Sequence, residues 1–148
     1  MSFRAAVRAT PSVATSLKPG LRGLRSEHRG LVEISDARRF TGSVDLDKAL
    51  RAQKPNEPRW DYVVGLAGAV QAIWIEAHPA SSLHIDPVLA KLGWLRAWLP
   101  SEAPALNVLK ARFVWIATGA VALHAGGPQM RRIAQAGLEF RAKRLHID

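Results

Sequence analysis

Residues 59–80 read RWDYVVGLAGAVQAIWIEAHPA, and this stretch decides the fold. Its two apolar runs, Arg59–Leu66 and Val70–Ala77, are rich in Val, Ile and aromatic residues, which predicts two β-strands. The glycine-containing connection Gly65–Gly68 between them is short, so we expect an antiparallel hairpin.

Each predicted strand carries one carboxylate, although both are otherwise suited to a protein interior. Asp61 lies near the start of the first strand and Glu76 near the end of the second. Side chains alternate across a strand, so Glu76 shares a face with Trp74 and His78. If the strands pair through the glycine turn, Asp61 and Glu76 are neighbours at one end of the sheet.

The rest of the chain alternates helical and strand patterns around this hairpin. Capping residues, prolines and apolar spacing predict a helix at 43–53, a helix at 87–99, strands at 112–118 and 120–124, a helix at 128–136 and a short strand at 144–147. We expect Pro100 to end the second helix and Gly119 to separate two strands. This order predicts an α/β (mixed α+β) fold with a small central mixed sheet and helices packed on it.

Length and composition are those of one folded domain. The chain has 148 residues, of which 48% are hydrophobic, and it contains no cysteine. A disulfide scaffold and a thiolate metal site are therefore excluded, and a reducing compartment is compatible. No apolar run reaches the roughly 20 residues of a membrane-spanning helix. We expect a bacterial, cytoplasmic protein with no membrane span.

The net charge of +9 is concentrated at the two ends of the chain. Residues 1–30 are rich in Arg and Ser and poor in acids, which predicts a basic, loosely ordered arm ahead of a single domain at 31–148. A transit peptide has a similar composition and is the alternative. Near the other end, a second basic group consists of Arg131, Arg132, Arg141, Lys143 and Arg144. A basic balance of this kind favours a polyanionic partner, either nucleic acid or an anionic membrane surface. Both ends could contact a phosphate backbone or be solvated surface, and a nucleic-acid partner is a possibility that the charge supports.

Two neighbouring carboxylates repel each other unless a cation lies near them, and Mg²⁺ or Mn²⁺ suits oxygen ligands. The element order, with Asp61 on the first strand of the hairpin and Glu76 on the second, resembles the PD-(D/E)xK nuclease-like superfamily. The resemblance covers roughly residues 43–124. It implies a restriction-endonuclease-like core and a metal-dependent nuclease, with Asp61 and Glu76 as metal ligands.

His78 occupies the position of the superfamily's lysine, which is a departure from its motif. In variants of the superfamily this lysine is relocated to the following helix, where Lys91 is the candidate in this chain. The resemblance therefore implies Asp61, Glu76, Lys91 and His78 as catalytic residues.

Other interpretations of the same residues remain open at this point. Glu76 could form an ion pair with Arg59 or Arg112, and His78 could simply end a strand. The five tryptophans are expected in the core, with base stacking as the minor alternative. The function alternatives are a non-catalytic nucleic-acid-binding protein of the same fold and a protein–protein interaction module. The sequence specifies no protein partner and no oligomeric state.

Overall fold

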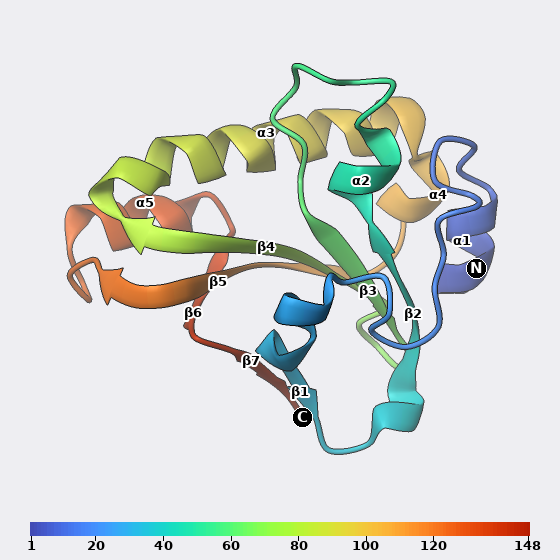
Figure 1. The fold of residues 1–148 in the computed structure, drawn as a ribbon, viewed down its shortest axis with the longest axis horizontal. Helices are drawn as coiled ribbons and strands as arrows, with labels where there is room; N and C mark the ends of the chain where they lie inside the picture. The colour runs from blue at the N-terminus through green and yellow to red at the C-terminus, as the bar shows by residue number, and fades with distance from the viewer.

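The computed structural model describes all residues, 1–148, and has a five-stranded mixed sheet at its centre (Figure 1). Strands β2 (Phe40–Asp45), β3 (Tyr62–Leu66) and β4 (Ala72–Ser81) form an antiparallel meander. Strands β5 (Ala111–Ala122) and β6 (Glu139–Ala142) continue the sheet in parallel with β4. The predicted mixed sheet and the hairpin at its centre are both confirmed.

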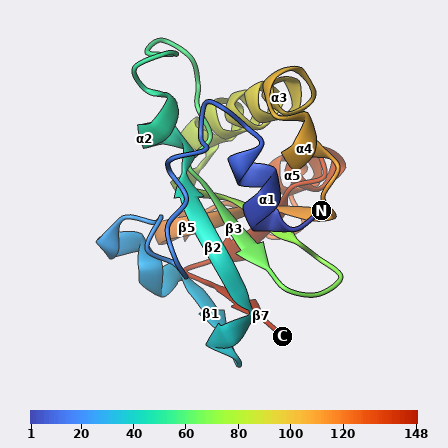
Figure 2. The same cartoon turned by 90° about the vertical axis from the view of Figure 1, so that its right-hand side faces the viewer.

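Helices cover one face of the sheet (Figure 2). The long helix α3 (Ile85–Glu102) connects β4 to β5, as expected of a crossover between parallel strands. It packs on the sheet with α1 (Phe3–Arg8), α4 (Pro104–Asn107) and α5 (Pro128–Gln135). This face holds the larger apolar core, which includes three fully buried tryptophans, Trp60, Trp74 and Trp115.

A two-stranded parallel ribbon and a short helix cover the other face. The ribbon pairs β1 (Val32–Ile34) with β7 (Leu145–Ile147), and the 3₁₀ helix η1 (Ser26–Leu31) precedes it. A second, smaller apolar cluster lies here, with Tyr62 and Val64 from β3. Alternate residues of β3 therefore enter different cores, as the period of two requires. Two further 3₁₀ turns are η2 (Ala37–Arg39) and η3 (Ser82–His84).

The predicted helix at 43–53 is wrong in its first part. Ser43 and Val44 belong to β2, where they pair with β3, and only α2 (Leu46–Leu50) is helical. Asp45 ends the strand and caps the helix, because its side chain accepts a hydrogen bond from the Lys48 N–H. The leucine spacing correctly predicted the helical part, whereas pairing with β3 makes Ser43 and Val44 part of a strand.

Helix α3 also differs from its prediction, because it begins at Ile85 and continues through Pro100 to Glu102. Proline removes one backbone hydrogen bond, but here it stands in the last turn at an exposed position. The neighbouring Trp98 and Leu99 are buried and hold that turn against the core. Helix α5 matches its prediction and ends before Gly137, which has a φ of 77°.

The strands predicted at 112–118 and 120–124 are one continuous strand, β5. Gly119 has a φ of 73° and lies at an irregularity of the β4–β5 register, opposite Pro79 and Ala80. The glycine therefore forms a bulge where a turn was expected. Strand β4 extends past Ala77 to Ser81, because these additional residues pair with the long strand β5. Strand β6 was not predicted.

The first thirty residues pack on the domain, in contrast to the loosely ordered arm expected from their composition. Phe3, Ala6 and Val7 of α1 are buried in the larger core. Further along, the backbone groups of Lys18 and Ser43 exchange two hydrogen bonds of 2.9 Å. None of the helices is long and apolar enough to cross a membrane.

Candidate functional site

The pairing of β3 with β4 places the two predicted carboxylates together. Tyr62 lies opposite Ile75, so Asp61, which precedes the strand, lies opposite Glu76. Both side chains project from the sheet face that packs against α3, in line with Val63 and Trp74. Their predicted proximity at one end of the hairpin is confirmed.

Each carboxylate is fixed by a backbone group of the opposite segment. The Ala77 N–H donates to Asp61 Oδ2 at 3.0 Å, and the Asp61 N–H donates to Glu76 Oε1 at 3.2 Å. Glu76 is fully buried, and Asp61 is 8% exposed. These bonds hold the two carboxylates in place and leave Asp61 Oδ1 and Glu76 Oε2 for the side chain of Lys91 from α3.

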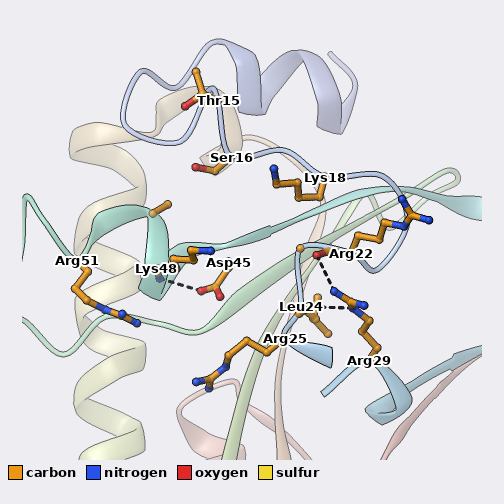
Figure 3. Close-up of a pocket in the computed structure, with 12 residues that line it drawn as sticks. Thr15, Ser16, Lys18, Arg22, Leu24, Arg25, Arg29, Asp45, Lys48 and Arg51 are labelled. Carbon is orange, nitrogen blue, oxygen red and sulfur yellow. Dashed lines mark hydrogen bonds between the residues drawn. The ribbon is translucent and has the colours of Figure 1, made fainter. Parts of the chain in front are cut away.

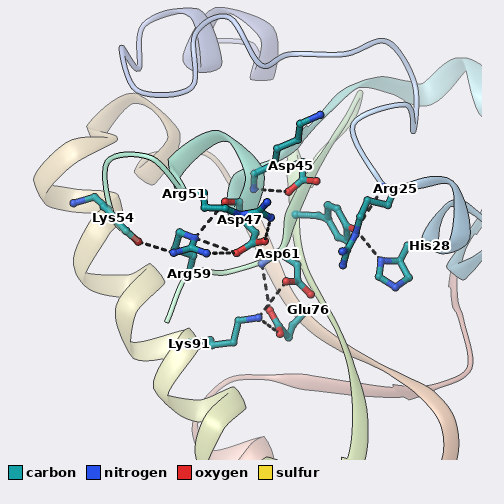
Figure 4. Close-up of polar contacts among 12 residues, drawn as sticks. Arg25, His28, Asp45, Asp47, Arg51, Lys54, Arg59, Asp61, Glu76 and Lys91 are labelled. Atoms are coloured by element: carbon teal, nitrogen blue, oxygen red, sulfur yellow. Dashed lines mark hydrogen bonds and ion pairs between the residues drawn. The ribbon is translucent and has the colours of Figure 1, made fainter. Parts of the chain in front are cut away.

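Lys91 completes the site from the second turn of α3 (Figure 4). Its Nζ lies 3.1 Å from Asp61 Oδ1 and also contacts Glu76 Oε2. The side chain of Lys91 is 17% exposed, so the contact is largely shielded from water. We refer to these three residues as the Asp61–Glu76–Lys91 cluster.

The Lys91 ammonium contacts two carboxylates in this cluster, so one positive charge faces two negative charges. The pKa values of Glu76 and Lys91 are shifted by this arrangement and by burial. Burial raises the pKa of Glu76, and the charge of Asp61 raises it further, while His78 and Lys91 act in the opposite direction. Burial alone would lower the pKa of Lys91, but the facing Glu76 and Asp61 raise it above its ordinary value of 10.5. Lys91 therefore remains a cation, and Glu76 is the group that is costly to ionise.

His78 lies at the edge of the cluster and reaches one carboxylate. Its Nδ1 is 3.4 Å from Glu76 Oε2, and its ring packs edge-on against that of His84, with centroids 5.0 Å apart. His84 is itself hydrogen-bonded to Ser81 at 2.7 Å. No group of three or more His, Asp or Glu side chains is arranged to hold a metal ion. The oxygen donors that could serve a cation are those of Asp61 and Glu76.

The two arginines considered as partners of Glu76 pair with other acids. Arg59 bonds Asp47 at 3.0 Å, and Arg112 forms a two-pronged ion pair with Glu139. The ion-pair interpretation therefore named the right kind of interaction for Glu76 but the wrong cations. The cation that contacts Glu76 is Lys91, which the superfamily resemblance had implied for this site.

The basic residues predicted at the C-terminal end are mostly engaged with acids. Exposed Arg131 and Lys143 have no acidic partner, whereas the other three form ion pairs: Arg132 with Asp86, Arg141 with Glu139, and Arg144 with Glu33. These pairs reduce the charge available for a phosphate backbone.

A second, more concentrated basic site was missed by the sequence reasoning. A cavity of about 570 Å³ lies between the N-terminal segment and α2 (Figure 3). Its twelve lining residues include six cations: Lys18, Arg22, Arg25, Arg29, Lys48 and Arg51. We call this site the basic pocket. The clustering of Arg22, Arg25 and Arg29 in the sequence was the available signal, but their convergence with α2 was not visible.

Tyr62 ties the basic pocket to the hairpin. Its hydroxyl accepts a hydrogen bond from Arg25 Nε at 3.0 Å and lies 2.7 Å from His28 Nδ1. Burial raises the pKa of Tyr62, so the hydroxyl stays protonated, and with Arg25 as its donor it is suited to donate to His28. The bond to Tyr62 therefore fixes the Arg25 side chain beside β3, the strand that begins directly after Asp61.

No protein-family model, curated protein or solved structure matches this chain. The function must therefore be argued from the two sites themselves.

Proposed function

We propose that this protein is a metal-dependent, nuclease-like phosphodiesterase acting on DNA or RNA, with the Asp61–Glu76–Lys91 cluster as its active site. The observation that carries the proposal is the convergence of the cluster from two adjacent strands and the following helix. This is the arrangement implied by the PD-(D/E)xK resemblance when the lysine is relocated to the helix. The order of a meander, a crossover helix and a parallel strand supports the same proposal.

The donors of the cluster suit Mg²⁺ or Mn²⁺. Such ions take oxygen ligands and are commonly held by one or two carboxylates together with water and substrate phosphates. Asp61 and Glu76 would hold the ion, and the Lys91 ammonium, which contacts both, would have to move aside. A bound ion would neutralise charge on a phosphodiester and make a bound water more acidic.

The protein's own groups have separable roles in this proposal. The two backbone N–H groups hold Asp61 and Glu76 in fixed positions, so their remaining oxygens need no reorganisation. Lys91 provides a permanent positive charge beside the position of a scissile phosphate. His78 is within reach of Glu76 and would orient that carboxylate.

A second candidate is a nucleic-acid-binding protein of the same fold without catalysis. Glu76 has no exposed surface, and the Lys91 ammonium already balances part of the charge of the pair. An ion pair of this kind is also a purely structural arrangement. The two candidates make the same prediction for binding and opposite predictions for cleavage.

The decisive experiment incubates purified protein with labelled single- and double-stranded DNA and RNA, in Mg²⁺, in Mn²⁺ and in EDTA. Asp61→Asn and Glu76→Gln keep the shape of each side chain and remove its charge. The matched control is Glu102→Gln, an exposed acid at the end of α3. Direct Mn²⁺ binding, measured by electron paramagnetic resonance, gives a readout that does not depend on turnover.

The proposal predicts cleavage and Mn²⁺ binding in the wild type and in Glu102→Gln, and loss of both in Asp61→Asn and Glu76→Gln. Circular dichroism establishes that each variant is folded. Cleavage that persists in Glu76→Gln would exclude this site. Nucleic-acid binding without cleavage under any metal condition would favour the second candidate.

A further inference from the structure

The basic pocket gathers several positive charges that no acid opposes. Four of its cations have no acidic partner, namely Lys18, Arg22, Arg29 and Lys48, and all four residues are exposed. The single acid in the lining, Asp45, is occupied with capping α2. Like charges in one concave site repel one another, so their placement points to an anionic ligand.

The pocket is built into the fold by contacts with the buried residue Ser43. The hydroxyl of Ser43 accepts a hydrogen bond from the Gly23 N–H at 2.8 Å, and its backbone pairs with Lys18. A Cβ on Gly23 would lie 2.5 Å from the Ser43 backbone, so only glycine permits this close approach. The N-terminal segment is thus held on β2 and presents its cations in a fixed arrangement.

The pocket lies at the same end of the sheet as the Asp61–Glu76–Lys91 cluster. Asp45, which lines the pocket, pairs with Tyr62 directly after Asp61. Arg25 bonds the hydroxyl of that tyrosine. This bond is the main cause that raises the pKa of Arg25, and the charge of Asp61 adds a smaller contribution. A ligand bound among these cations would therefore lie at the same end of the sheet as the carboxylate pair, although Tyr62 itself faces the other side of the sheet.

We propose that the basic pocket binds the phosphate backbone of a nucleic-acid strand and is the principal substrate-binding surface of this protein. This inference rests on the proposed function for the class of ligand. The sequence had suggested phosphate contacts for both basic ends of the chain, and the inference assigns the main role to the N-terminal segment together with α2. Four of the six cations are arginines, whose planar guanidinium groups match phosphate oxygens in pairs. The number of cations exceeds the needs of a single phosphate, which favours a chain of them.

The chemistry of the lining favours nucleic acid over an anionic membrane. Membrane-surface binding combines basic residues with apolar side chains that enter the lipid. The pocket contains only two apolar residues, the buried Leu24 and the half-buried Ala49. The large exposed apolar side chains of the protein, such as Leu83 and Val108, do not line it.

The test compares two double variants that remove equal charge. Arg22→Gln with Lys48→Gln neutralises two unpaired cations of the pocket. Arg131→Gln with Lys143→Gln neutralises one arginine and one lysine that are also exposed and unpaired, at the C-terminal end. Binding of a fluorescent single-stranded oligonucleotide is followed by anisotropy in EDTA over a series of salt concentrations, so no cleavage intervenes.

We expect the pocket variant to bind more weakly and its salt dependence, the slope of log affinity against log salt, to fall by about one per cation removed, or about two in total. The C-terminal variant should keep the wild-type slope. Equal losses in both variants would mean that overall charge alone attracts the strand, and the proposal would be overturned. It would also be overturned if the wild type bound phosphatidylserine vesicles and not the oligonucleotide.

The experiment separates this inference from the proposed activity. Pocket-dependent binding with no cleavage under any metal condition supports the pocket and refutes the enzyme. Cleavage by a protein whose pocket variant binds like the wild type refutes the pocket and leaves the enzyme standing.

Discussion

Replacing Lys91 by methionine should reveal how strongly the fold depends on the ammonium between the two carboxylates. The substitution keeps most of the aliphatic length of the side chain and removes its charge. Glu76, fully buried, and Asp61, 8% exposed, would then face each other without a cation. Removing one partner of a buried ion pair costs about 3–5 kcal/mol, so we expect the free energy of unfolding to fall by that amount near neutral pH.

The loss in Lys91→Met should depend on pH in a defined direction. The pKa of Lys91 is raised above 10.5, so its stabilising contribution is fully present below that value and disappears only in strong alkali. The pKa of Glu76 is raised above 4.5, so the folded state favours its protonated form and the cost of ionising it grows as pH rises. Without Lys91 that cost increases. The destabilisation should therefore be largest at neutral and mildly alkaline pH and should shrink as pH falls through the raised pKa of Glu76.

Urea denaturation followed by tryptophan fluorescence measures the effect, because Trp60, Trp74 and Trp115 are fully buried. Lys110→Met is the matched control, since Lys110 is exposed and forms no ion pair. Adding Glu76→Gln to Lys91→Met removes one of the two stranded charges and should restore part of the stability. A Lys91→Met protein as stable as the Lys110→Met control at both pH values would refute the reasoning.

Two further predictions concern the sheet around the site. Gly65→Ala should destabilise the protein by about 1–3 kcal/mol, because the added Cβ would lie 2.1 Å from the Phe3 ring. Thermal unfolding measures this loss. An unchanged melting temperature would contradict the packing of α1 on β3. Glu139→Gln should cost less than about 1 kcal/mol near neutral pH. Because the bond from Arg112 lowers the pKa of Glu139 below 4.5, that contribution is present above 4.5 and is lost as pH falls through the lower folded value. A urea series over that range should show the two proteins converging in acid.

Much of the fold followed from local sequence patterns. The Val-, Ile- and aromatic-rich runs in residues 59–80 and the short glycine connection predicted the β3–β4 hairpin, because a short connection restricts the register of the two strands. That register brought Asp61 and Glu76 together. The spacing of Val88, Leu92, Leu95 and Leu99 identified α3, because one helical stripe must face the sheet.

Other elements depended on partners that are distant in the chain. Ser43 and Val44 became strand because β3 lies beside them, and β5 remained continuous through Gly119 because β4 is long enough to pair with it. The N-terminal residues looked like a solvated arm by composition. Some of their apolar side chains are nevertheless buried. The ring of Phe3 packs against Gly65 of β3, where the absence of a side chain leaves room for it.

The sequence by itself determined that two carboxylates would meet on one hairpin, because strand periodicity and turn position are local properties. Only the tertiary structure decided which cation joins them, because Lys91 reaches the pair through the packing of α3 on the sheet. The basic pocket also depends on the tertiary structure, because the pairing of the N-terminal segment with β2 brings Arg22 and Lys48 together. The charges were visible in the sequence, but their convergence depends on contacts between segments far apart along the chain.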